Sequence, residues 1–214
     1  MNWLAHALLS KPNIEFRLGN LLADLIKGRE RAAMPAGFLD GVRHHQVIDA
    51  FTDSHPIVFR SRARIGGDYR HANGILVDIF YDHFLALDWE QYSTEPLETF
   101  TAQLYADIRA GMTQFPAQAQ AVLERMISED RLGSYRRLDG IEESLRRVSL
   151  RLAARIGRDL GLERGVSELV ANFESLRADF VEFFPQLQAR TGCSADAEPF
   201  VAPDATSTEV SPGS

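Results

Sequence analysis

Residues 74–89 form the most apolar segment of the chain, with the sequence GILVDIFYDHFLALDW. Its hydrophobic residues occupy all sides of a helix, which is the pattern of a helix buried at the centre of an α-helical domain. Nearly every other segment has apolar residues at helical spacing, and none shows the sustained alternation of a strand between hairpin turns. The sequence therefore predicts an all-α fold, a helical bundle built around this segment.

Prolines and glycines mark the ends of most of the other predicted helices. We expect the segment from 73 or 74 onward to be accompanied by helices over 2–9, 13–27, 35–56, 57–65, 96–112, 116–127, 141–160 and 166–184. Residues 1–190 contain no linker or internal repeat and are expected to form one domain. Residues 191–214 are rich in Ala, Pro, Ser, Thr and acidic residues, so we expect an acidic, disordered tail.

The charge balance restricts the partners of the chain. Its formal net charge is −7, and general nucleic-acid binding needs a basic surface instead. A lone cysteine, Cys193, fits a reducing compartment. The N-terminus lacks the features of a signal peptide, and no run approaches the roughly 20 apolar residues of a membrane span. We therefore expect a cytoplasmic protein that binds neither nucleic acid nor membranes, while the sequence leaves its oligomeric state open.

The helix predicted over 35–56 carries a stripe of metal-binding side chains. His45, Asp49 and Asp53 follow one another at i, i+4 spacing and so lie on one face. Ile48 and Phe51 lie beside the stripe, which indicates that this face is partly buried. Buried carboxylates are costly unless they are paired or bind a cation. The stripe therefore predicts a divalent-metal site.

A second group of acidic residues lies on the central apolar helix. Asp78 and Asp82 are also spaced i, i+4, and like charges at this spacing repel each other unless a cation or an arginine lies near them. His83 follows directly. Asp24, on the helix predicted over 13–27, is a third candidate, and His6 is interpreted either as a core residue or as a ligand.

The chemistry of these candidate histidines and aspartates favours particular metal ions and reactions. Histidine and carboxylates without cysteine favour Mn²⁺, Fe²⁺ or Mg²⁺ over structural zinc. Such a site suits phosphate-ester hydrolysis, because a metal ion polarises a phosphoryl oxygen and acidifies water. We rank Asp24, His45, Asp49, Asp78 and Asp82 as metal ligands, and His83 and Asp53 as further ligands or as catalytic residues that orient water and move a proton.

Basic residues gather near these candidates in the sequence. Four arginines lie between residues 60 and 70, and three cations lie between 27 and 31. They are either a solvated surface or a basic rim that binds an anionic phosphate or an acidic protein. We name Arg43, Arg60 and Arg64, together with His6, as candidate substrate-binding residues.

Several motifs, taken in order, resemble those of a known family. They are MNWLAH at 1–6, GNLLAD at 19–24 followed by Lys27 and Gly28, the set Gly41, His45, Asp49, Asp53 and Pro56, and Asp78 with DHFL at 82–85. Together they resemble the signature of acyl carrier protein phosphodiesterases, and the likeness covers most of residues 1–190.

This resemblance implies an all-α enzyme related to the HD superfamily of metal-dependent phosphohydrolases. Members of the family remove 4′-phosphopantetheine from holo acyl carrier protein, typically with Mn²⁺, which implies a role in fatty acid metabolism and acyl carrier protein as the partner. One feature departs from the broader superfamily, because the sequence contains no adjacent His-Asp pair. We therefore rank the ligands by helix geometry.

Two other interpretations stay open. One is an HD-like phosphohydrolase acting on a nucleotide or another small phosphate ester. The other is a non-catalytic helical module whose arginines bind an acidic protein. A helical di-iron protein is disfavoured, because the chain has no Glu-x-x-His pair.

Overall fold

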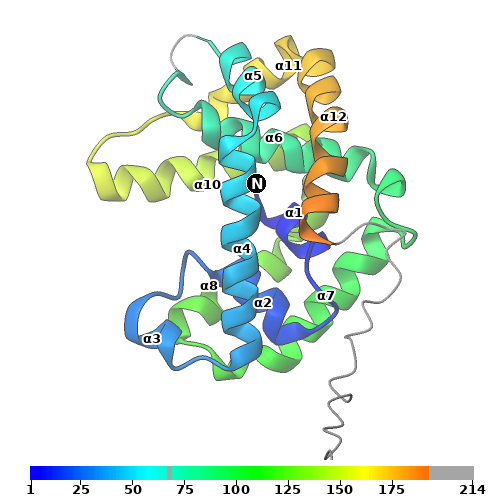
Figure 1. Cartoon of the computed structure of the whole chain (residues 1–214). Helices are drawn as coiled ribbons and strands as arrows, with labels where there is room; N and C mark the ends of the chain where they lie inside the picture. Colours follow the sequence, from blue (N-terminus) through cyan, green and yellow to red (C-terminus); the bar gives the residue numbers. More distant parts are fainter. Residues whose placement is uncertain (67–68, 193–214) are drawn as a thin grey trace, which may run out of the picture.

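The computed structural model describes residues 1–66 and 69–192, and within these ranges the regular structure is helical with no strand (Figure 1). The prediction of an all-α fold is confirmed. The α-helices are α1 (Trp3–Leu8), α2 (Ile14–Leu22), α3 (Gly28–Ala32), α4 (Ala36–Ser54), α5 (Pro56–Arg64), α6 (Asn73–Leu87), α7 (Leu97–Gly111), α8 (Ala117–Ser128), α9 (Arg131–Ser134), α10 (Leu138–Ile156), α11 (Val166–Ala171) and α12 (Phe173–Thr191).

The apolar segment predicted to be central is α6. Ten of its fifteen residues are buried, and it packs against α1, α5, α10 and α12. Its side chains Phe80, Tyr81 and Phe84 are fully buried. Burial of large apolar side chains is the main favourable term in folding. The buried side chains of α6 therefore form the centre of the core, and the neighbouring helices pack against them.

The closest pair of helices is α2 and α4, and two glycines allow their approach. A Cβ atom added to Gly19 would lie 2.0 Å from the carbonyl oxygen of Phe38, and one added to Gly41 would lie 2.0 Å from that of Phe16. Only glycine fits at both crossings. The crossings fix α4 against α2, and the stripe of α4 predicted to bind metal begins at His45, one turn after Gly41.

One predicted helix is shorter in the structure, and another is divided. The helix expected over 13–27 ends at Leu22, because the guanidinium of Arg31 folds back and donates to the carbonyls of Ala23 and Ile26. The helix expected over 166–184 is interrupted at Asn172, whose side-chain amide donates to the carbonyl of Glu168 at the end of α11.

Most of the remaining boundaries agree with the predictions to within a few residues, but α12 continues well beyond 184, and the short helices α3 and α9 were not predicted. The tail expected after residue 190 lies mostly outside the described residues, since α12 continues to Thr191. Among the described helices, none combines the length and the apolar character that a membrane crossing requires.

Candidate metal centre

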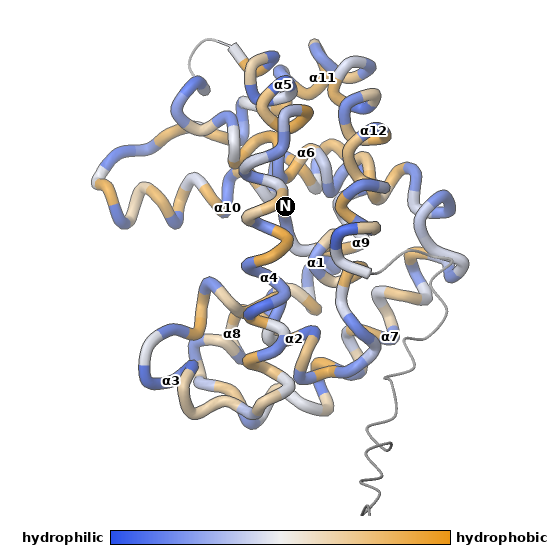
Figure 2. Tube along the Cα trace, viewed as in Figure 1, coloured by the Kyte–Doolittle hydropathy of each residue, from blue (hydrophilic) through white to orange (hydrophobic). Residues whose placement is uncertain are grey.

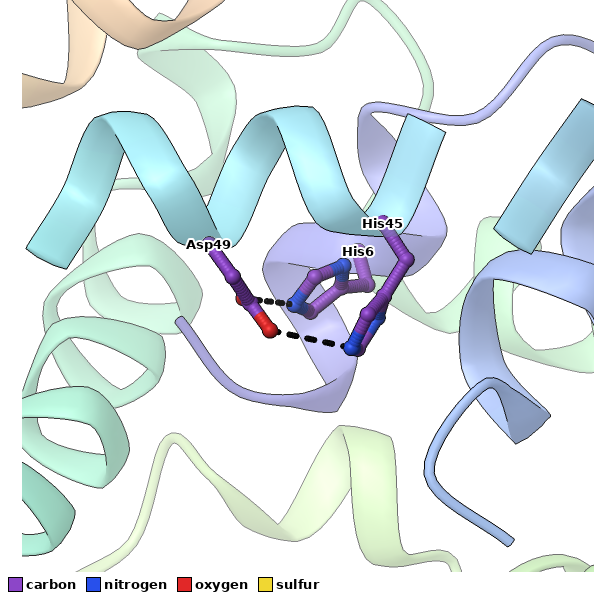
Figure 3. A group of neighbouring side chains, drawn as sticks. All are labelled: His6, His45 and Asp49. Atoms are coloured by element: carbon purple, nitrogen blue, oxygen red, sulfur yellow. Dashed lines mark ion pairs between the residues drawn. The ribbon is translucent and has the colours of Figure 1, made fainter. Parts of the chain in front are cut away.

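Three side chains from two helices converge beside α4. The Nε2 atom of His45 lies 2.9 Å from Oδ2 of Asp49 one turn further along α4. The Nε2 atom of His6, from α1, lies 3.2 Å from Oδ1 of the same carboxylate. The two imidazoles stack with ring centroids 4.4 Å apart (Figure 3). One ligand atom from each residue lies within 4.8 Å of the others, which is compact enough for all three to bind one ion.

The protonation of His6 is fixed by its neighbour Asn20. The Asn20 side-chain amide donates to the carbonyl of His6 and to the hydroxyl of Ser10. Its oxygen is therefore left to accept, and it lies 2.7 Å from His6 Nδ1. In the neutral ring, Nδ1 then carries the proton and Nε2 presents a lone pair.

The lone pair of His6 Nε2 faces a negative charge. Burial lowers the pKa of His6, so the ring is neutral near pH 7. Burial opposes ionisation of Asp49, but its contact with His45 and the nearby N-terminal ammonium hold the pKa of Asp49 well below its usual range. His6 Nε2 is itself buried without a hydrogen-bond partner. An unprotonated nitrogen facing a carboxylate oxygen is unfavourable by itself, and a cation bound by both resolves the conflict.

The three residues line a cavity of about 490 Å³. Asp24, Asp53 and Asp78 line it too. The Asp24 carboxylate is exposed and lies 3.8 Å from His45 Nε2. Asp53 is paired with Arg62 at 2.6 Å. Three of the predicted acidic residues are thus close to the His/Asp group without belonging to its compact core.

Asp78 contacts a cation in the structure. Its carboxylate lies 3.2 Å from the α-amino nitrogen of Met1, which is 3.8 Å from Asp49. Burial alone would lower the pKa of this amine, but Asp78, Asp49 and Asp82 together raise it. The repulsion expected between the acids of α6 is therefore relieved here by the ammonium group.

Asp82, predicted to be a ligand, does not join the compact group. Its two carboxylate oxygens accept hydrogen bonds from the backbone N–H groups of Leu4, at 2.7 Å, and Ala5, at 3.1 Å. These are unpaired donors at the start of α1, which a carboxylate satisfies well. Asp82 therefore positions α1, and with it His6.

His83, predicted to be catalytic, forms its contacts within the protein core. Its Nδ1 atom lies 2.6 Å from the carbonyl oxygen of Tyr135, and its ring packs on Phe84 and Phe173. Burial lowers its pKa, so the ring is a neutral donor to this carbonyl. His83 is absent from the residues that line the cavity, so the structure gives no support to its catalytic assignment.

The three candidate substrate-binding arginines are engaged elsewhere. Arg60 and Arg64 bind the buried carboxylate of Asp179 on α12, at 2.7 and 2.8 Å. Arg43 pairs with Asp40 on the outer side of α4. None of them lines the cavity. Their alternative interpretation as surface or scaffold residues fits the structure better.

Two features of the centre were not resolved from the sequence. His6 was left open between a core residue and a ligand and was also named for substrate binding; in the structure its Nε2 atom belongs to the His/Asp group. Asn20 was not assigned a role, although its place in the GNLLAD motif, four residues before Asp24, was a signal. Asn20 lies on an apolar face of its helix and is fully buried. A buried polar side chain is expected to form a hydrogen bond with another polar group.

The fold and the centre together define a class. This is an all-α protein in which two histidines and an aspartate, gathered in an open cavity, fit a divalent metal ion.

The comparisons with known proteins define the family. The family model for acyl carrier protein phosphodiesterase matches residues 1–187, and the chain belongs to this family. It is 30% identical to the acyl carrier protein phosphodiesterase of Enterobacter sp. (strain 638) over 191 residues, which is 89% of this chain and 97% of the relative. The proteins of the same name from Salmonella dublin and Yersinia pestis are also 30% identical, and the matches cover 91% and 87% of this chain and 100% and 95% of those relatives. No solved structure matches the chain, so kinship with the HD-domain fold stays a prediction.

Proposed function

We propose that this protein hydrolyses the phosphodiester bond between 4′-phosphopantetheine and the serine of holo acyl carrier protein. Water adds to phosphorus, the bond from phosphorus to the serine oxygen breaks, and that oxygen takes up a proton. The products are the apo carrier and 4′-phosphopantetheine. Membership of the family supports the choice of reaction.

The observation that carries the chemistry is the lone pair of His6 Nε2 facing the Asp49 carboxylate, with His45 beside both. In our proposal His6, His45 and Asp49 hold a divalent cation, and Asp24 and Asp78 supply further oxygens at the edge of the group. The cation, when bound, polarises a phosphoryl oxygen and acidifies water.

We propose Mn²⁺ as the ion, with Mg²⁺ and Fe²⁺ as the alternatives. Two imidazoles and one carboxylate form a mixed nitrogen and oxygen donor set, which suits Mn²⁺ and Fe²⁺ better than it suits Mg²⁺.

Two further residues of the cavity have roles in this proposal, one in orienting a ligand and one in proton transfer. Asn20 keeps His6 in the tautomer that presents Nε2 to the cavity. Asp53 lines the cavity and is exposed, and we retain it as the residue that moves a proton between water and the serine oxygen. Reducing conditions fit the single cysteine, and we propose a cytoplasmic location.

The test is an intact-mass measurement of the carrier. Enzyme freed of metal by a chelator is supplied with Mn²⁺ and incubated with holo carrier, and we expect the carrier to lose the mass of the prosthetic arm. Asp49→Asn should abolish both this loss and Mn²⁺ binding. The matched control is Asp40→Asn on the exposed side of the same helix, which should retain both.

The result discriminates among the candidate functions. Hydrolysis of small phosphate esters with an unchanged carrier would favour the small-ester phosphohydrolase. Binding of the carrier without hydrolysis, equally in Asp49→Asn and in the metal-free protein, would favour the non-catalytic module.

A further inference from the structure

The cavity presents an electrostatic problem for the substrate proposed above, and this inference rests on that proposed function. Asp24, Asp49, Asp53 and Asp78 all line the cavity. A phosphodiester is itself an anion, so four carboxylates oppose its entry. Three of these carboxylates have a cation of their own: the Met1 ammonium for Asp78, Lys27 for Asp24 and Arg62 for Asp53. These cations are already engaged and are not free to bind a phosphate as well. Cationic side chains facing the same cavity are therefore needed to bind the phosphate.

Two arginines of α10 meet this requirement. The cationic side chains that line the cavity are Lys27, Arg151 and Arg155, and the Met1 ammonium, which also lines it, is paired with Asp78. Lys27 is paired with Asp24 at 3.4 Å. Within the described part of the chain, neither Arg151 nor Arg155 forms an ion pair with a carboxylate. Arg147, one turn earlier on α10, differs because it is bound by acidic residues on two sides.

The wall of the cavity formed by α10 is also partly apolar. Arg151 and Arg155 are one turn apart and share a face with Val148 and Leu152, which line the same cavity and are half-buried. Figure 1 shows α10 extending past α4 on the side where α3 lies, and in Figure 2 hydrophilic and hydrophobic residues alternate along it. This wall offers paired guanidinium groups next to an aliphatic surface.

We propose that Arg151 and Arg155 bind the non-bridging oxygens of the substrate phosphate, while Val148 and Leu152 contact the aliphatic part of the arm. A planar guanidinium matches the geometry of phosphate oxygens and binds two of them at once. These two residues take the role that the sequence had suggested for Arg43, Arg60 and Arg64.

Binding of 4′-phosphopantetheine tests the proposal directly. Its dissociation constant is measured by calorimetry on the full chain loaded with Mn²⁺, for the wild type, for Arg151→Gln/Arg155→Gln, and for the control Arg146→Gln/Arg158→Gln. The control removes the same charge from two exposed positions that do not line the cavity: Arg146 within α10, where it pairs with Glu143, and Arg158 just after the helix ends. We expect affinity to fall by about tenfold or more in the first double variant and by less than about twofold in the control. Equal affinities in the two double variants, or no binding by the wild type, would overturn the proposal.

Kinetics separate phosphate binding from contact with the protein part of the substrate. Hydrolysis is followed for holo carrier and for a small diester, bis(4-nitrophenyl) phosphate. Arg151→Gln/Arg155→Gln should raise KM for both substrates and leave Mn²⁺ affinity unchanged. A rise confined to holo carrier would show that the guanidinium groups contact the carrier surface, and would also overturn the proposal.

Failure of the proposed function gives a different result. Should the wild type leave holo carrier intact but bind 4′-phosphopantetheine through the two arginines, the hydrolytic assignment is wrong and the phosphate subsite stands.

Discussion

The Nδ1 atom of His6 lies 2.7 Å from the side-chain oxygen of Asn20. This contact joins α1 to α2 and decides which nitrogen of His6 faces the cavity. The amide of Asn20 is in turn held by the carbonyl of His6 and the hydroxyl of Ser10, so it cannot rotate without losing two bonds. The centre is therefore oriented by a residue that lines the cavity without belonging to the His/Asp group.

Replacing Asn20 should weaken metal binding without removing a ligand. In Asn20→Ala the His6 ring loses the acceptor that fixes its tautomer, and loss of such an orienting partner typically lowers metal affinity about 10–100-fold. Mn²⁺ titration followed by electron paramagnetic resonance measures the effect. Asn13→Ala, which removes a capping bond to Phe16 at the start of the same helix, is the control and should lower stability alone. Equal Mn²⁺ affinities in the two variants would contradict the orienting role.

Replacing Gly41 should separate α2 from α4. The new Cβ of Gly41→Ala would lie 2.0 Å from the Phe16 carbonyl oxygen, so the helices must move apart, at a cost of about 1–3 kcal/mol in the free energy of unfolding. Urea unfolding measures this cost, and Mn²⁺ affinity should fall as well because His45 moves relative to Asn20. Gly66→Ala has open space around the added atom and should change neither property. A Gly41→Ala protein as stable as Gly66→Ala would disprove the close crossing.

Stability should depend on pH through Asp82. Burial raises the pKa of Asp82 to about 7, despite the opposing effect of its bonds from Leu4 and Ala5. The folded chain thus holds this proton more tightly than the unfolded chain, whose aspartates titrate near pH 4. Unfolding releases the proton between these values, so the contribution of Asp82 to stability falls as pH rises from about 4 to 7.

The comparison with Asp82→Asn isolates this effect. The groups facing Asp82 are the Met1 amine, Asp78 and Tyr135, and the variant retains all three. Urea unfolding of both proteins between pH 5 and pH 8 should show the wild type losing stability relative to the variant as pH rises, by an amount on the order of a few kcal/mol. A constant difference between the two proteins over this range would refute the raised pKa.

Arg64 should contribute to stability rather than to substrate binding. Its guanidinium binds the buried carboxylate of Asp179, and its removal leaves Arg60 as the one remaining cation on that carboxylate among the described residues. Arg64→Gln should therefore lower the melting temperature by more than about 3 °C, while KM for holo carrier stays the same. Arg43→Gln, which breaks an exposed pair, is the control for stability. A raised KM for Arg64→Gln, in protein shown to be folded, would restore the substrate-binding interpretation.

The sequence predicted those features that depend on local pattern. The i, i+4 spacing of His45 and Asp49 brings the two side chains together within one helix, and the all-round apolar pattern of residues 74–89 identifies the central helix α6. The contacts of Asp82 and His83 could not be foreseen, because their partners come from elsewhere in the chain: the backbone N–H groups of α1 for Asp82 and the carbonyl of Tyr135 for His83. Spacing along one helix carries no information about such contacts.

The ion pairs of the arginines could not be foreseen for the same reason. Arg60 and Arg64 are separated from Asp179 by more than a hundred residues, so a count of local charge suggested an open basic rim. Arg151 and Arg155 were not named from the sequence, and they reach the cavity because α10 packs against α6, whose residues line the same cavity.

The bonds from Asp82 to Leu4 and Ala5 span nearly eighty positions of the chain. A truncated protein that ends before α6 would contain His6, His45 and Asp49. It would lack the Asp82 carboxylate, which holds α1 in place. We expect such a fragment to bind Mn²⁺ weakly, and to recover its affinity when the missing part is added in trans. The Mn²⁺ affinity would then report whether the two parts of the chain have assembled.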